Sequence, residues 1–240
     1  MNHDNRKNGF TLVELMLAMG FVSALLLAIA MTVIQIGNIY NTGITYKSVN
    51  QAGGSIASQL LRDINSSPPF DLPGTNPVHY VSSMAEPWGG RLCTGQYSYI
   101  WNYGDAIITG DQSRLNLYSG TNSTIPINFI KVADSTSSYC TYATTTKKLI
   151  NMADAVELLD VGKNNLAIHD FSITSSAFDD STNQRIYNIS FLIGTNEKDT
   201  LDASSGPIKC RLPDDVKSDP TYCAVNQFDI VARAGNNAAE

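Results

Sequence analysis

Four cysteines, Cys93, Cys140, Cys210 and Cys223, are the clearest candidates for covalent chemistry in this sequence. They lack the Cys-x-x-Cys spacing that zinc and redox sites commonly show, so disulfide bonds suit them better. Such bonds persist in protein segments that lie outside the cytoplasm. Three connectivities are open, and proximity along the chain favours Cys93 with Cys140 and Cys210 with Cys223.

Acid–base catalysis has few candidate residues. His3, His79 and His169 are the only histidines, and their neighbours suggest no catalytic triad. His169 stands between Ile168 and Asp170 in a segment with strand-like alternation. We therefore expect a surface or hydrogen-bonded structural histidine there, and no enzyme.

Two acidic groups could hold calcium. One joins the Asp pair at 179–180 to Ser181 and Asn183. The other joins the Asp pair at 214–215 to Asp219. Neither has the glycine and the terminal glutamate at the spacing that an EF-hand loop requires. We expect ordinary acidic turns, no metal and no cofactor, since glycine-rich phosphate-binding motifs are absent as well.

The most unusual acid is Glu14, the only charged residue in the apolar stretch from Phe10 to Ile36. This stretch follows a polar segment, residues 1–9, that contains Arg6 and Lys7. As a helix, a stretch of this length reaches across a hydrocarbon core of roughly 30 Å. The two basic residues favour a cytoplasmic N-terminus.

The junction between these segments has a specific pattern: a basic leader ends in Gly9, Phe10 follows, and Glu14 is the fifth residue after the glycine. An ordinary secretory signal is instead cleaved after its apolar core, and the core is lost. On this pattern the chain is identified as a member of the type IV prepilin family. It resembles most closely the large minor pilins and the J-type pseudopilins.

The resemblance implies that a prepilin peptidase cuts between Gly9 and Phe10, that the new Phe10 amine is methylated, and that the helix is retained. It also implies that Glu14 pairs with the Phe10 amine of a neighbouring subunit. A carboxylate in an apolar environment costs several kcal/mol unless it is paired. Only one axial height of a docking subunit would pair both charges, so the pair would set the register of a filament.

Residues 37–65 continue the helix with one apolar face. The apolar positions near helical spacing are Tyr46, Val49, Ile56, Leu60 and Ile64. This predicts one helix from about Phe10 to Ile64, with the later half packed on a globular head and a stop at Pro68-Pro69. The pair Gly53-Gly54 weakens the helix by roughly 1 kcal/mol per residue.

Residues 66–240 are expected to form an extracytoplasmic head. Its first part, 66–95, is rich in proline and glycine and is read as a long loop. Strand-like segments then follow at 97–103, 114–118, 125–132, 156–161, 166–174, 186–193 and 228–232. The expected fold class is α+β and pilin-like, with a long N-terminal helix packed on a mainly antiparallel sheet. The loop between Cys210 and Cys223 resembles the C-terminal disulfide loop of many pilins.

The charge balance argues against nucleic acid as a general partner. The chain carries 16 Lys and Arg against 22 Asp and Glu, a net charge of −6. Nucleic-acid binding relies on cations that neutralise phosphates, so only a local basic patch would leave DNA as a partner. The partners implied by the resemblance are other pilin subunits through the N-terminal helix, the prepilin peptidase, and the inner membrane before assembly.

Four functions are open at this stage. The first is a minor pilin of a type IV pilus, which the size of the chain favours over a major pilin. The second is a pseudopilin of a type II secretion system, whose filament would stay in the periplasm. The third is an adhesin or DNA receptor carried by the filament. The fourth, a membrane-anchored enzyme, lacks a catalytic constellation.

Overall fold

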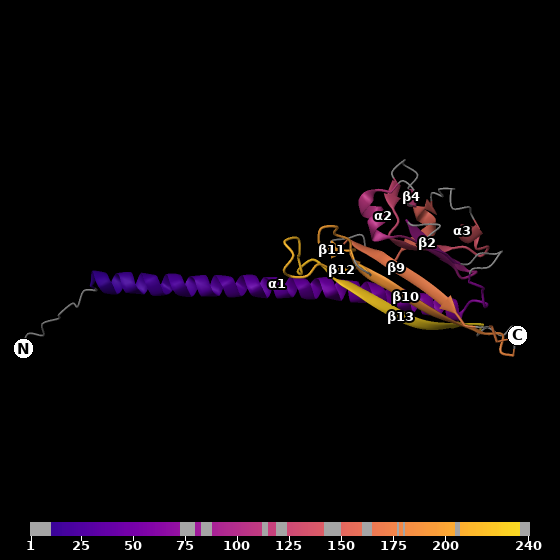
Figure 1. Cartoon of the computed structure of the whole chain (residues 1–240), viewed down its shortest axis with the longest axis horizontal. Coiled ribbons are helices and arrows are strands. Elements are labelled where there is room, and N and C mark those ends of the chain that lie inside the picture. Colours follow the sequence, from indigo (N-terminus) through magenta and orange to yellow (C-terminus); the bar gives the residue numbers. More distant parts are fainter. Residues whose placement is uncertain are drawn as a thin grey trace, which may run out of the picture. The chain divides into compact units, whose positions relative to one another are not determined.

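The computed structural model describes residues 11–72, 80–82, 88–111, 115–118, 124–141, 150–159, 165–176, 178–179, 181–204 and 207–235. The chain divides into two compact units, Met1–Asn41 and Thr42–Glu240. One helix, α1 (Leu12–Asn65, 54 residues), runs through the boundary between them. The predicted helix from about Phe10 to Ile64 is therefore confirmed within the described residues (Figure 1).

The part of α1 in the first unit is apolar and exposed all round. Within the described residues, α1 is the one helix long and apolar enough to cross a membrane, and none of its apolar window is buried. The hydroxyl groups of Ser23 and Thr32 are hydrogen-bonded within the helix, because Ser23 Oγ donates to Met19 O and Thr32 Oγ1 to Ala28 O. These features fit a membrane anchor or a signal sequence near the N-terminus.

The part of α1 in the second unit carries the predicted apolar stripe with one correction. Val49, Ile56, Leu60 and Ile64 are fully buried, whereas Tyr46 is 47% exposed. Thr45 is buried in its place. Position 45 precedes Val49 by four residues, close to a full helical turn, so it faces the head more directly than position 46 does.

Gly53 and Gly54 lie within the continuous helix and have different surroundings. A Cβ atom on Gly53 would lie 2.1 Å from Cε2 of Phe228, whereas one on Gly54 would meet nothing within 4 Å. Gly53 thus admits the Phe228 ring from β13 (Val225–Ala234), and this ring stacks on Phe191 with centroids 5.4 Å apart. Close packing explains why a helix-weakening residue stands at position 53.

This difference predicts opposite effects from two neighbouring substitutions. Gly54→Ala should raise the free energy of unfolding by up to about 1 kcal/mol, because alanine favours the helix. Gly53→Ala should lower it by about 1–3 kcal/mol, because the new methyl group displaces the Phe228 ring. Urea unfolding of the full chain in mild detergent, followed by near-ultraviolet circular dichroism, measures both. Equal effects from the two variants would contradict the packing described above.

Two antiparallel sheets cover the later half of α1. The first has the order β13-β10-β9, with β9 at Leu166–Ser175 and β10 at Arg185–Thr195. Figure 1 shows these three strands side by side across the helix. The second sheet has the order β1-β2-β3-β6-β8. Its strands are β1 (Tyr80–Ser82), β2 (Gly89–Cys93), β3 (Tyr97–Asn102), β6 (Phe129–Ala133) and β8 (Ala155–Glu157). Both sheets contribute to one core around the helix, so the predicted α+β fold class is confirmed.

A second core lies in the part of the head around α2 (Gly104–Thr109) and a small sheet, β5-β4-β7. These strands are β4 (Asn116–Tyr118), β5 (Thr124–Pro126) and β7 (Ile150–Asn151). The remaining elements are α3 (Ser138–Thr141), a 3-10 turn (Met152–Asp154), β11 (Leu201–Asp202) and β12 (Lys209–Cys210). The predicted single strand 125–132 is thus two strands, β5 and β6, that belong to different sheets.

The prediction that 66–95 is a long loop is wrong for its described part. It contains β1 and β2, and all five residues of β2 are buried. The pair Gly89-Gly90 belongs to that predicted loop, but in the structure it lets two strands approach closely: a Cβ on Gly89 would lie 2.0 Å from Trp101 O. A glycine within a strand often marks a place where another backbone segment approaches closely.

Candidate functional site

Glu14 lies in the first turn of α1, where it closes a capping box with Thr11. Its Oε2 atom accepts hydrogen bonds from the Thr11 backbone N, at 2.9 Å, and from Thr11 Oγ1, at 2.8 Å. In return Thr11 Oγ1 accepts from Glu14 N at 3.3 Å. The cleavage pair Gly9 and Phe10 lies outside the described residues. The Thr-x-x-Glu spacing is a sequence signal for this cap that our sequence reading did not use.

The side chains of this turn are all exposed. A carboxylate can accept several hydrogen bonds at once, and both bonds from Thr11 end on the same oxygen. The cap therefore orients Glu14 while leaving capacity for a further donor. An ammonium group is a donor of the kind that such a carboxylate binds strongly.

Both disulfides have the connectivity that the sequence favoured. Cys93 is bonded to Cys140, and Cys210 to Cys223, with no free cysteine in the described residues. The first bond joins β2 to α3 across a sequence separation of 47 residues, and the second closes a short loop with a separation of 13. Each bond therefore fixes a different part of the head.

Asp134 organises the surroundings of the first disulfide. Its carboxylate accepts from Ser98 Oγ at 2.7 Å and from the backbone N atoms of Ser138 and Tyr139 at 3.0 and 3.1 Å. Burial raises the pKa of this carboxyl, but the hydrogen bonds outweigh burial and hold the pKa below its ordinary value. The charged form thus caps α3, which carries Cys140.

A lowered pKa gives Asp134 a predictable role in acid unfolding. Its contribution to stability is complete above the ordinary pKa of an Asp carboxyl and is lost as the pH falls through the lower pKa of the folded state. Asp134→Asn should therefore flatten the fall in unfolding free energy on acidification. Urea unfolding at a series of acidic pH values measures this slope. An unchanged slope would show that other carboxyl groups, and not Asp134, determine how the unfolding free energy falls on acidification.

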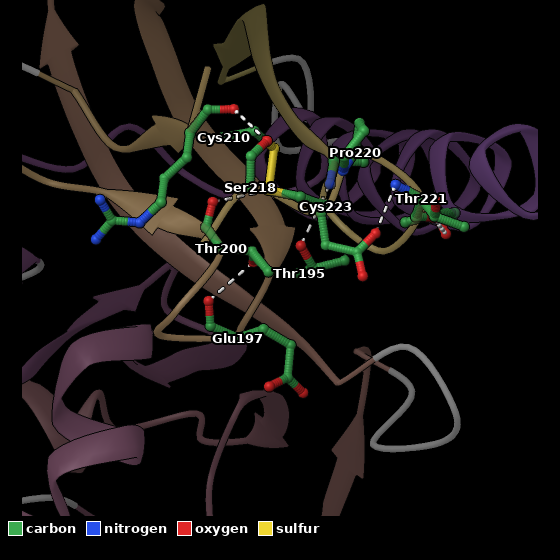
Figure 2. The surroundings of a disulfide bond; sticks show 12 residues. Thr195, Glu197, Thr200, Cys210, Ser218, Pro220, Thr221 and Cys223 are labelled. Carbon is green, nitrogen blue, oxygen red and sulfur yellow. Dashed lines mark hydrogen bonds between the residues drawn. A yellow bond between two sulfur atoms is a disulfide. The ribbon is translucent and has the colours of Figure 1, made fainter. Parts of the chain in front are cut away.

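The Cys210–Cys223 loop is fastened to α1 at its closing end. Thr45 Oγ1 donates to Thr221 O at 3.0 Å, and Thr42 Oγ1 lies 3.4 Å from Pro220 O as a longer hydrogen bond. Figure 2 shows Pro220 and Thr221 beside the disulfide, next to the helix. Within the loop, Arg211 Nη1 pairs with Asp215 at 3.0 Å. The disulfide thus pins a loop that also holds the helix.

The two disulfides are expected to stabilise the head to different degrees. Chain entropy predicts that removing the longer Cys93–Cys140 closure lowers the free energy of unfolding by about 1 kcal/mol more than removing Cys210–Cys223 does. The test compares urea unfolding of the double variants Cys93→Ala/Cys140→Ala and Cys210→Ala/Cys223→Ala. A larger loss from the shorter closure would show that the contacts of that loop with α1 outweigh chain entropy.

A buried charge cluster joins α1 to the second sheet. Asp63, on α1, accepts from Tyr99 Oη at 2.5 Å, and Lys131 Nζ lies 2.5 Å from the same carboxylate oxygen. Lys131 also stands 3.8 Å above the Tyr97 ring. Burial, followed by the hydrogen bond to Asp63, raises the pKa of Tyr99, so its hydroxyl stays protonated and donates. Sequence reasoning missed this cluster, although Asp63 follows Leu60 by three residues on the apolar stripe.

His169 has the surroundings of a structural histidine. His169 Nε2 lies 3.1 Å from Thr195 O, and burial lowers the pKa of the ring, which is therefore neutral at pH 7. This agrees with a hydrogen-bonded structural histidine. His3 and His79 lie outside the described residues.

Three of the carboxylates considered for calcium, those of Asp179, Asp215 and Asp219, accept hydrogen bonds within their own turns. Asp179 accepts from Ser181 and Thr182, and Asp219 accepts from Thr221 N. Asp180 lies outside the described residues. In the part of the chain that the structure describes, no three His, Cys, Asp or Glu residues gather as a metal site would require.

Comparison of the chain with protein-family models, with curated proteins and with solved structures gives no match. The geometry of the described residues and the pattern at residues 6–14 therefore carry the functional argument alone.

Proposed function

We propose that this protein is a structural subunit of a type IV pilus, a minor pilin that takes part in pilus assembly or display. The observation that carries the proposal is the unbroken helix Leu12–Asn65. Its first part is exposed and apolar and contains one acid, Glu14, and its later part is packed in the head. A chain built in this way can leave a membrane and pack the same apolar helix against its neighbours in a filament.

Glu14 fits a role of the helix in assembly better than it fits a role as a simple membrane anchor. An anchor gains nothing from an acid within its apolar stretch, because burying a carboxylate in hydrocarbon is costly. Cleavage after Gly9 would create an amine at Phe10, four residues before Glu14. The Glu14 carboxylate is exposed, so it is accessible to the amine of a neighbouring subunit. In this proposal the pair fixes the axial register of each subunit.

The two disulfides support a head that works outside the cytoplasm. The second candidate is a pseudopilin of a type II secretion system, whose filament remains in the periplasm, where disulfides persist as well; deletion of the gene separates the two. The proposed location is the inner membrane, with the head outside the cytoplasm, followed by the pilus. The head would be displayed there for adhesion, motility or DNA uptake.

Mass spectrometry of the processed protein tests the proposal directly. The expected product begins at Phe10, carries a methyl group on that amine and keeps the whole helix. A product that retains residues 1–9, or that has lost the apolar segment, would overturn the proposal. The quantity of the subunit in sheared filaments then separates the readings: a trace amount indicates a minor pilin, a dominant band indicates a major pilin.

The pseudopilin reading has its own genetic test. Deleting the gene should impair piliation, twitching or DNA uptake if the protein is a minor pilin. Loss of exoprotein secretion with intact twitching and DNA uptake would assign it to the secretion system instead.

A further inference from the structure

We propose that a cavity between α2 and the β11–β12 hairpin binds a free α-amino acid with an apolar side chain. This hairpin cavity has a volume of about 260 Å³, and its walls include Ile108 of α2, His169 of β9 and Leu201 of β11. All the residues that line it belong to the unit Thr42–Glu240, so the site is complete within that unit. The binding of an amino acid goes beyond the proposed function and does not depend on it.

The size and walls of the hairpin cavity suit a small organic molecule. A water molecule occupies about 30 Å³ in the liquid, so the cavity has room for about nine waters or for one small ligand. Ile108, Leu201 and Ile208 supply aliphatic walls. The His169 ring, which is hydrogen-bonded to Thr195 O, adds an uncharged one. Ligand sites usually combine apolar walls of this kind with a few charged or polar groups.

Five charged side chains line the hairpin cavity, and three of them have partners in the structure. Arg211 Nε donates to Asp199 O at 2.8 Å, and Arg211 Nη1 pairs with Asp215 at 3.0 Å. Lys217 Nζ lies 3.5 Å from Asp199 Oδ1, but both side chains are largely exposed, so this pair is weak and Lys217 stays accessible. A guanidinium group has five N–H donors, and these contacts of Arg211 use two of them. Arg211 and Lys217 therefore keep donors that a ligand can use.

The other two charged side chains, Asp105 and Lys198, determine the chemistry of the ligand. Neither has an ion-pair partner among the described residues, and Glu197, next to Lys198 in the chain, lines a separate pocket. Asp105 stands on α2 and Lys198 on the segment between β10 and β11, so two different walls carry opposite charges. A plain carboxylate would leave Asp105 unpaired, and a plain amine would leave Lys198 unpaired. A zwitterion pairs its ammonium group with the first and its carboxylate with the second.

The aliphatic walls determine the side chain of the amino acid. Ile108 and Ile208 are partly exposed, so part of their apolar surface still faces solvent. An apolar side chain in the cavity removes this surface, and its own, from water, which is the main source of favourable free energy in such contacts. Leucine has the two charges and an aliphatic side chain, and it is therefore the probe for this site.

The experiment follows the isoleucine methyl groups of the full chain in mild detergent by NMR while L-leucine is added. Ile108 and Ile208 report on the hairpin cavity, and Ile56 and Ile64, in the core around α1, are internal controls. The resonances of the first pair should shift and saturate, whereas those of the second pair should not move. For a ligand as small as leucine we expect a Kd on the order of 1 mM.

Three relatives of leucine separate the contributions of its parts. Leucinamide lacks the carboxylate, N-acetyl-leucine lacks the ammonium group, and serine lacks the aliphatic side chain. Leucinamide and N-acetyl-leucine should each bind about fivefold more weakly than leucine, the upper range for an exposed ion pair. Serine should bind more weakly still, because it leaves the aliphatic walls in contact with water.

Two variants assign each charge of the ligand to one residue. Lys198→Gln should weaken the binding of leucine and N-acetyl-leucine about fivefold and leave leucinamide unchanged. Asp105→Asn should weaken leucine and leucinamide and leave N-acetyl-leucine unchanged. Lys47→Gln and Asp154→Asn are the matched controls, because these residues are exposed and do not line the cavity, and they should change nothing.

Two results would overturn the proposal. If the Ile108 and Ile208 methyl groups do not shift at leucine concentrations far above 1 mM, the cavity is not an amino-acid site. If leucine and N-acetyl-leucine bind equally and Asp105→Asn has no effect, the site takes any small apolar carboxylate and the zwitterion is wrong. Neither result bears on the proposed function, which cleavage after Gly9 tests separately.

Discussion

Replacing Asp63 by alanine is expected to lower the free energy of unfolding of the head by about 3–5 kcal/mol, the range for breaking a buried ion pair from one side. Asp63 has only 7% of its side chain exposed, and its carboxylate is the acceptor for both Tyr99 and Lys131. The substitution leaves a buried hydroxyl and a largely buried ammonium without that acceptor. It thereby weakens the contact of α1 with the second sheet.

The same cluster predicts a graded series of variants. Asp63→Asn should lower the free energy of unfolding less than Asp63→Ala does, because an amide oxygen still accepts from Tyr99. The triple variant Asp63→Leu/Tyr99→Phe/Lys131→Met should recover much of the loss, since apolar groups of similar volume avoid the desolvation of charges. Asp154→Ala, at an exposed acid, is the surface control and should change stability by less than about 0.5 kcal/mol.

Urea unfolding of the full chain in detergent, followed through the buried tryptophans, measures this series. If Asp63→Ala behaved like the surface control, the cluster would contribute nothing to the docking of the helix. If the triple variant were as unstable as the single one, the loss would come from the fit of the side chains and not from the unpaired charges.

The parts of the fold that follow from local sequence were predictable. The span of α1 follows from uniform apolarity and then from helical spacing, because both patterns reside in neighbouring residues. Strands β9 and β10 alternate apolar and polar residues on a half-buried sheet, so their positions at 166–174 and 186–193 were also found. The disulfide pairing agreed with proximity along the chain because each bond closes a local part of the head.

The parts that depend on distant partners were not predictable. Strand β2 is buried on both faces and begins with two glycines, so its sequence shows neither alternation nor strand-forming side chains at its start. The close approach of Gly89 to Trp101, and of Gly53 to Phe228, appears only when the partner is known. Asp63 gives a local sign, an acid on an apolar stripe, but its partner Lys131 is 68 residues away in the sequence.

Glu14→Ala is expected to reduce incorporation of the subunit into filaments by about 100-fold or more. An unpaired charge in an apolar assembly costs on the order of 3 kcal/mol, and each 1.4 kcal/mol is a factor of about ten. Without the carboxylate, the amine of the neighbouring Phe10 would be that unpaired charge. The amount of subunit in sheared filaments, relative to its amount in the membrane, is the quantity to measure.

Two further variants separate charge pairing from the capping of the helix. Glu14→Gln keeps an oxygen that accepts from Thr11 and so keeps a capping box, but it removes the charge. Thr11→Val removes the capping hydroxyl and leaves the carboxylate. Charge pairing predicts that Glu14→Gln fails almost as fully as Glu14→Ala and that Thr11→Val assembles nearly normally. The opposite order would mean that Glu14 acts by starting the helix, and register would then have to come from the packing of apolar side chains.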